Sequence, residues 1–126
     1  MQIIENPVEQ AALLLESAAF VLLVPEWHTK RQFARTREHS GQVVNPLAPN
    51  ADCFCAAGAL QAAAHELGDG GGLALAVEEL IATINVPVWT KQDASIAYWN
   101  DKPETTPEHV AQTMLETATR VRLYDI

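Results

Sequence analysis

Apolar residues recur at steps of three and four along the first part of the chain, which predicts an amphipathic helix from Pro7 to about Val24. Asn6 can cap this helix, and Pro7 suits the first helical position because an N–H group there would have no helical partner. Pro25 then ends the helix. The predicted buried stripe consists of Val8, Ala11, Ala12, Leu15, Ala18, Ala19 and Leu22.

A second helix is predicted from Cys53 to Leu67, with Asp52 as its N-cap and Gly68 as its stop. Most of its residues are small, which leaves room for another backbone to approach closely. We therefore expect this helix at the centre of the domain.

Two further helices follow. Leu73 to Asn85 repeats the helical pattern, and a last helix begins after a threonine cap at Thr105 or Thr106. The segment Ser95 to Trp99 is too short to classify, and residues 100–103 are predicted to form a turn. The buried stripe of the last helix is Val110, Met114, Ala118 and Val121.

The segment between the first two helices changes to a strand-like pattern. Residues 33–37 and 42–44 resemble two short strands, and the residues between them form a turn that contains Gly41. The sequence thus predicts a mainly α fold: a four-helix compact domain with a small β-hairpin or ordered loop inserted after the first helix. A single domain over residues 1–126 is expected from the length.

Composition narrows the class of partner. The chain carries 8 Lys and Arg against 16 Asp and Glu, for a formal net charge of −8. Proteins that bind duplex nucleic acid by broad electrostatic attraction have an excess of basic residues, so that class is excluded. Half of the positive charge lies in one short arm, at Lys30, Arg31, Arg35 and Arg37. Such an arm could dock a phosphate or an acidic partner, although a solvated loop is the commoner meaning.

The cysteines indicate the compartment. Cys53 and Cys55 are separated by one residue, so a bridge between them would be strained, and reduced thiols are expected. The first residues do not form a secretory signal, and the apolar run from Ala18 to Val24 is too short to cross a membrane. We expect a soluble cytoplasmic protein without membrane contact.

Cys55 is the candidate nucleophile. Near a helix start, the unpaired N–H groups would lower the pKa of its thiol, and His109 with Asn100 or Asp101 could complete a catalytic set. Simple packing of a buried cysteine is the commoner alternative. A zinc site usually has two pairs of Cys or His ligands, each pair closely spaced in the sequence. This chain has one Cys-x-Cys pair and only scattered histidines, so no metal and no cofactor are predicted.

A second set of residues suits a ligand. Arginine forks beside an aromatic platform can bind a nucleotide or another phosphorylated metabolite. The structural alternative is that the tryptophans close the ends of the core and that the sequence after the last of them forms a rigid corner. The candidate binding residues are Trp27, Arg35, Arg37, Trp99, Asn100 and Asp101.

With these residues identified, the chain resembles a family of small uncharacterised proteins from actinobacteria and bacteriophages, a domain of unknown function. The resemblance spans about residues 8 to 120. It implies a helical architecture and a phage or actinobacterial setting, and it brings no activity. The features that carry it are Trp27, the arm from Phe33 to Gly41, the Phe-Cys-Ala-Ala-Gly-Ala-Leu run from Phe54 to Leu60, Trp99-Asn100-Asp101, and Thr106 leading to Val110.

Small size, acidity and the lack of a convincing catalytic set favour a non-enzymatic interaction protein, such as a phage or actinobacterial accessory factor that binds and modulates another protein. A binding module for a nucleotide or phosphorylated ligand is one alternative. A cysteine-dependent enzyme using Cys55 and His109 is another. The small-residue helix also suggests close pairing of two copies in a homodimer.

Overall fold

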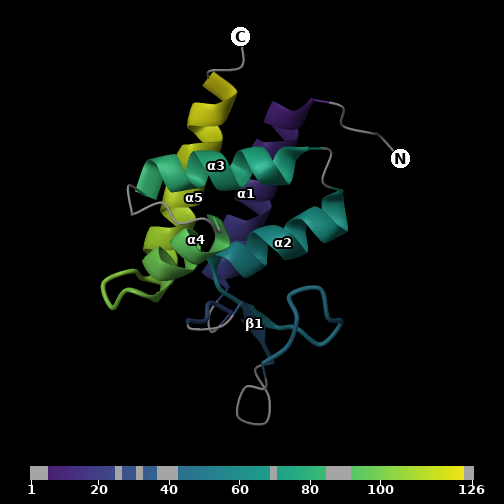
Figure 1. Cartoon of the computed structure of the whole chain (residues 1–126), viewed down its shortest axis with the longest axis vertical. Helices are drawn as coiled ribbons and strands as arrows, with labels where there is room; N and C mark the ends of the chain where they lie inside the picture. The colour runs from purple at the N-terminus through teal and green to yellow at the C-terminus, as the bar shows by residue number, and fades with distance from the viewer. Residues whose placement is uncertain are drawn as a thin grey trace.

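The computed structural model describes residues 6–24, 27–30, 33–36, 43–68, 71–84 and 92–123, and within them the chain forms five helices and two short strands (Figure 1). The predicted mainly helical class is confirmed, with five helices in these segments where the sequence predicted four. The elements are α1 (Pro7–Leu23), β1 (Ala34–Arg35), β2 (Cys53–Phe54), α2 (Ala56–Leu67), α3 (Gly72–Ile84), α4 (Gln92–Asp101) and α5 (Pro107–Leu123).

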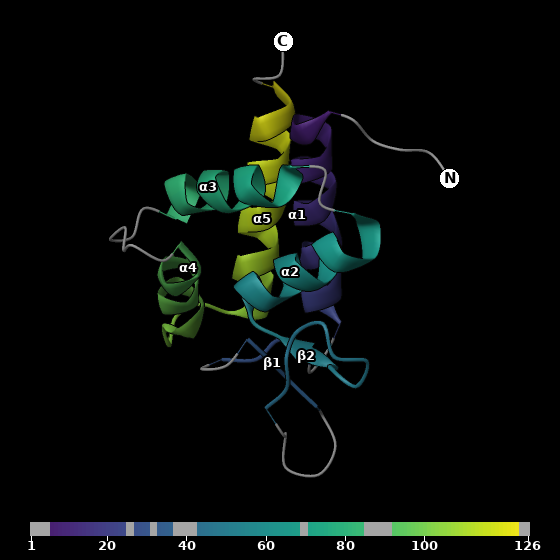
Figure 2. The same cartoon turned by 45° about the vertical axis from the view of Figure 1, so that its right-hand side comes forward.

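Helices α1 and α5 lie side by side and antiparallel, so that α1 begins and α5 ends at the same end of the domain (Figures 1 and 2). Helix α3 crosses this pair near that end, and α2 crosses α1 toward the other end, above the strands. The central element is α1, which packs against α2, α3 and α5. The expectation that the alanine-rich α2 is central was therefore wrong, because α1 buries the larger apolar stripe.

Helix α1 begins as the sequence predicts. Asn6 accepts a hydrogen bond from the Val8 N–H at 2.9 Å, and Pro7 occupies the first turn. Arg122 near the end of α5 then ties the two long helices together through ion pairs with Glu9 and Glu16 at 2.8 and 2.6 Å. The Arg122 guanidinium lowers the pKa of the Glu9 carboxyl by hydrogen bonding to it.

The start of α2 differs from the expectation. Its N-cap is Cys55 and not Asp52, and the Cys55 Sγ accepts a hydrogen bond from the Gly58 N–H at 3.3 Å. Cys53 and Phe54 form β2 instead of a first helical turn, and they pair antiparallel with β1. The tertiary pairing keeps this segment extended, because the Cys55 N–H also donates to the Phe33 carbonyl at 3.1 Å.

The predicted hairpin is only partly present. Ala34 and Arg35 are strand residues, but the strand partner is β2, which pairs Ala34 with Phe54 and Arg35 with Cys53. One backbone hydrogen bond does join the two segments predicted to pair: the Val44 N–H donates to the Ala34 carbonyl at 3.2 Å. The predicted turn, residues 38–41, lies outside the described residues.

Helix α4 is the element that the sequence pattern missed. Asn100 and Asp101 are its last residues, so the predicted turn begins only at Lys102. The buried face of α4 consists of Ser95, Ile96, Trp99 and Asn100, which have helical spacing. Two of the four are polar, so the face lacks the apolar stripe by which a helix is recognised.

Helix α5 agrees with the prediction. Thr106 caps it by accepting a hydrogen bond from the His109 N–H at 3.1 Å, and Val110, Met114, Ala118 and Val121 are all buried. None of the helices in the described segments has the length and apolar character that crossing a membrane requires.

Candidate functional site

The side-chain amide of Asn100 is the centre of a buried polar junction. Asn100 is fully buried at the end of α4, and its Nδ2 donates to the Thr29 carbonyl at 3.0 Å and to Asp101 Oδ1 at 3.1 Å. Its Oδ1 accepts from the Ala56 N–H at 3.0 Å and lies 2.7 Å from His28 Nε2. One side chain thereby joins α4, the first residue of α2 and the segment 27–30.

These bonds determine the hydrogen-bonding role of His28 Nε2. The Asn100 nitrogen faces two acceptors, so the amide orientation is determined, and His28 Nε2 must donate to the oxygen. Burial lowers the pKa of His28, which favours the neutral ring. His28 Nε2 therefore carries a proton, which it donates to the Asn100 oxygen. Because both donors and both lone pairs of the amide are used within the protein, Asn100 serves to position three segments.

Cys55 is packed in the core, as the commoner alternative expects, and the direction of its pKa shift is opposite to the one predicted for a helix start. Its side chain is 2% exposed, and burial raises the pKa of the thiol to about 11, outweighing the hydrogen bonds from the helix start. The sequence predicted a lowered pKa because the dipole of a helix start is visible in the sequence and desolvation is not. At neutral pH Cys55 is a buried, protonated thiol that caps α2.

We expect neither cysteine to react while the protein is folded. Cys53 and Cys55 are both reduced and buried, so Ellman's reagent should label no thiol in native protein at pH 8 and two thiols in guanidinium chloride. Because the pKa of Cys55 is raised, its thiolate forms only toward pH 11. Fast labelling of native Cys55 near neutral pH would contradict this arrangement.

The other predicted site residues are distributed over three places. Trp99 is 5% exposed, and its ring packs against that of His109, with the centroids 6.0 Å apart and the planes at 58°. Asp101 joins the Asn100 junction, whereas Trp27 lines a groove between α1 and α2. Of the two arginines, Arg35 is placed by its backbone in β1, and Arg37 lies outside the described residues.

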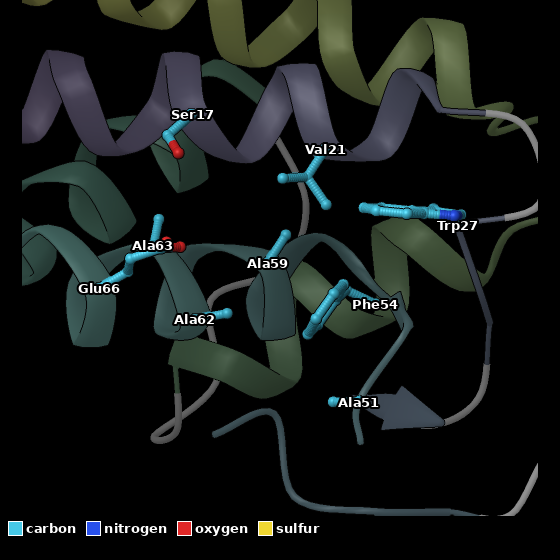
Figure 3. Close-up of a pocket in the computed structure, with 9 residues that line it drawn as sticks. All are labelled: Ser17, Val21, Trp27, Ala51, Phe54, Ala59, Ala62, Ala63 and Glu66. Atoms are coloured by element: carbon cyan, nitrogen blue, oxygen red, sulfur yellow. The ribbon is translucent and has the colours of Figure 1, made fainter. Parts of the chain in front are cut away.

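A groove between α1 and α2 is lined entirely by described residues (Figure 3). We call it the α1–α2 groove; its volume is about 220 Å³. In Figure 3 its aromatic end holds Trp27 and Phe54, and its polar end holds Ser17 and Glu66. The full lining is Ser17, Val21, Trp27, Ala51, Phe54, Ala59, Ala62, Ala63 and Glu66.

Two exposed apolar side chains lie near the C-terminal end of α1, the helix that forms one wall of the groove. Phe20 is 61% exposed, and Val24 at the helix end is also exposed. Phe20 is three residues from Ser17, so helical spacing places it on the same side of α1 as this groove residue, and Val24 is the extended C-cap that follows the helix. We call Phe20 and Val24 the apolar border. Exposed apolar residues near an apolar groove are typical of sites that bind other molecules.

Sequence reasoning identified only one residue of the groove, Trp27. The sequence held only a weak indication of the other groove residues. Ser17, Phe20 and Val21 all lie outside the predicted buried stripe of α1. Which face of α2 stays open depends on how the helices cross, and the sequence pattern does not contain that information.

The elements that line the groove carry acidic charge. Residues 7–23 and 43–67 contain four acids, Glu9, Glu16, Asp52 and Glu66, and no Lys or Arg. Arg122 pairs with the first two. Among the described residues, no ion pair involves Glu66, which lies exposed at the polar end of the groove. The groove thus presents an apolar lining and one acidic group.

In the described segments, no three His, Cys, Asp or Glu side chains gather in a way that could hold a metal ion. Neither a curated protein nor a solved structure matches the chain. Residues 6–120 match a family described as a family of unknown function, DUF6197. This match covers most of the chain, from the cap of α1 to Arg120 in α5, and it confirms the expected kinship with uncharacterised proteins. The chain belongs to the DUF6197 family of unknown function.

Proposed function

We propose that this protein is a small, acidic, non-enzymatic interaction protein that binds a segment of another protein in the α1–α2 groove. The observation that carries the proposal is the groove itself: two aromatic rings and four alanines line a surface depression, and α1, which forms one wall, also exposes Phe20 and ends at the exposed Val24. Aromatic anchors in a well-packed pocket supply most of the binding energy in protein interfaces.

The size of the groove supports a protein segment as its occupant. Pockets for small-molecule ligands and cofactors usually have volumes of about 300–1,000 Å³. The α1–α2 groove, at about 220 Å³, is smaller. It suits one or two side chains of a partner whose remaining surface lies on the apolar border.

The two alternative functions find less support. A phosphorylated ligand requires cations, but no residue of the groove lining is Lys or Arg, and Trp99 and Asn100 are buried away from solvent. A cysteine-dependent enzyme requires an accessible thiolate, which the burial and raised pKa of Cys55 oppose. We therefore place the proposed activity at the groove. A role as a phage or actinobacterial accessory factor is the biological setting that we propose for it.

A peptide selection tests this function. A random peptide library displayed on phage would be selected on the full chain, and the dissociation constants of the recovered peptides would be measured by fluorescence anisotropy. We expect Ala62→Trp, which fills the groove from α2, and Ser17→Trp, which fills it from α1, to weaken binding at least ten-fold.

The matched control is Ala74→Trp on the exposed face of α3, which should leave the affinity unchanged. Circular dichroism would verify that each variant is folded. The proposal is wrong if the selection yields no binding peptide, or if the recovered peptides bind both folded groove variants as tightly as the native chain.

A further inference from the structure

We propose that the segment bound in the α1–α2 groove carries a bulky apolar side chain for the aromatic end and a lysine or arginine for the polar end, where it pairs with Glu66. This inference rests on the proposed function and specifies the chemistry of the partner. It follows from the unequal ends of the groove (Figure 3).

The aromatic end selects an apolar group. Trp27, Phe54 and Val21 converge there beside the small side chains of Ala51 and Ala59 (Figure 3), and of the two rings Trp27 is half-buried and Phe54 is buried. Aromatic rings gain most from an apolar or aromatic partner that contacts a face or an edge. A charged group of the partner would lose its hydration at this end without an opposite charge in compensation.

The polar end selects a cation. Glu66 is the charged residue of the lining, and the hydroxyl of Ser17 lies at the same end (Figure 3). No residue of the lining is a Lys or Arg that could compensate Glu66, so an incoming cation meets a carboxylate that no described ion pair occupies. Such complementarity fixes the register and orientation of a bound segment more than it adds affinity.

Charge also argues against a second copy of this chain as the occupant. Each copy has a formal net charge of −8, and the lining elements are acidic. Two copies docked groove to groove would bring like charges together, which disfavours association. A basic segment of a different protein is favoured by the same charges.

The geometry of α2 sets the spacing of the two groups in the partner. Ala59 near the aromatic end and Glu66 at the polar end are seven residues apart, which is about 10 Å along a helix. An extended segment covers that span in about three residues, and a helical segment covers it in about seven. The basic residue should therefore follow or precede the bulky residue at one of these two spacings.

Charge reversal at Glu66 tests the inference with the peptides recovered by the selection. We expect them to carry a bulky apolar residue with Lys or Arg three or seven positions away. Glu66→Lys should weaken their binding about three- to five-fold, as is typical of one exposed ion pair. Replacing the basic residue of the peptide by Glu should restore affinity for Glu66→Lys, a coupling that a mere loss of fold cannot produce.

The control is Glu78→Lys, the same change at an exposed position of α3 away from the groove, which should have no effect on affinity. The two levels of the proposal fail in different ways. If groove-filling variants abolish binding but the peptides lack a basic residue and Glu66→Lys binds them unchanged, the partner chemistry is wrong and the groove function stands. If the groove-filling variants have no effect, the function itself is wrong.

Discussion

Replacing Asn100 with alanine is expected to lower the free energy of unfolding by about 3–5 kcal/mol, the largest loss we expect from removing a single polar side chain. The variant removes the amide oxygen that accepts from the fully buried Ala56 N–H and the amide nitrogen that donates to the Thr29 carbonyl. It also removes the acceptor of the half-buried His28 ring. Each buried group left without a hydrogen bond costs about 1–3 kcal/mol.

Urea denaturation followed by tryptophan fluorescence measures this loss. Asn50→Ala is the matched control, because Asn50 is exposed in a loop, and its replacement should change the stability by less than about 0.5 kcal/mol. Asn100→Asp separates hydrogen bonding from size. It keeps the shape but turns a second oxygen toward the Thr29 carbonyl, so it should also be strongly destabilising. A loss below about 1 kcal/mol for Asn100→Ala would show that the junction does not hold the three segments together.

Gly58→Ala is expected to destabilise the protein by about 2–3 kcal/mol, although alanine is the better helix former. A Cβ at this position would lie 2.9 Å from the Phe33 carbonyl carbon and closer still to its oxygen. Relief of this clash requires the backbone at Phe33 to move. That movement would break the hydrogen bond from the Cys55 N–H and disturb the pairing of β1 with β2.

The sign of the effect makes this prediction decisive. At an ordinary helix position, Gly→Ala stabilises by up to about 1 kcal/mol. Ala74→Gly on the exposed face of α3 supplies the reference, with an expected loss of about that size in the same protein. If thermal and urea unfolding found Gly58→Ala as stable as the native chain or more so, the close approach of Phe33 to α2 would be disproved.

The parts of the fold that the sequence predicted are those with local signals. Asn6 and Pro7 mark the start of α1, and Thr106 caps α5 as expected, because these residues satisfy backbone groups within a few positions of themselves. The small residues of α2 also indicated a close backbone approach, which Gly58 makes against Phe33. Helix α4 was missed because its buried face includes Ser95 and Asn100, which find their environment only in the folded protein.

The candidate site was predicted less well for a related reason. Asn100 and Asp101 were singled out as ligand-binding residues, and the structure places Asn100 in a junction whose partners are up to 72 residues away in sequence. Cys55 was expected to have a lowered pKa from its helix start, and burial reversed the direction. In both cases the residue was correctly identified as unusual, and its surroundings determined its role.

By itself, the sequence determined the helical class, the caps of the long helices and the acidic charge, since these depend on residue type and on spacing within a few turns. Only the tertiary structure decided which helix is central, where Asn100 directs its amide and which face of α2 remains open beside Trp27. These features depend on how the helices cross and on what each buried group contacts, and contacts between distant segments leave no periodic trace in a single sequence.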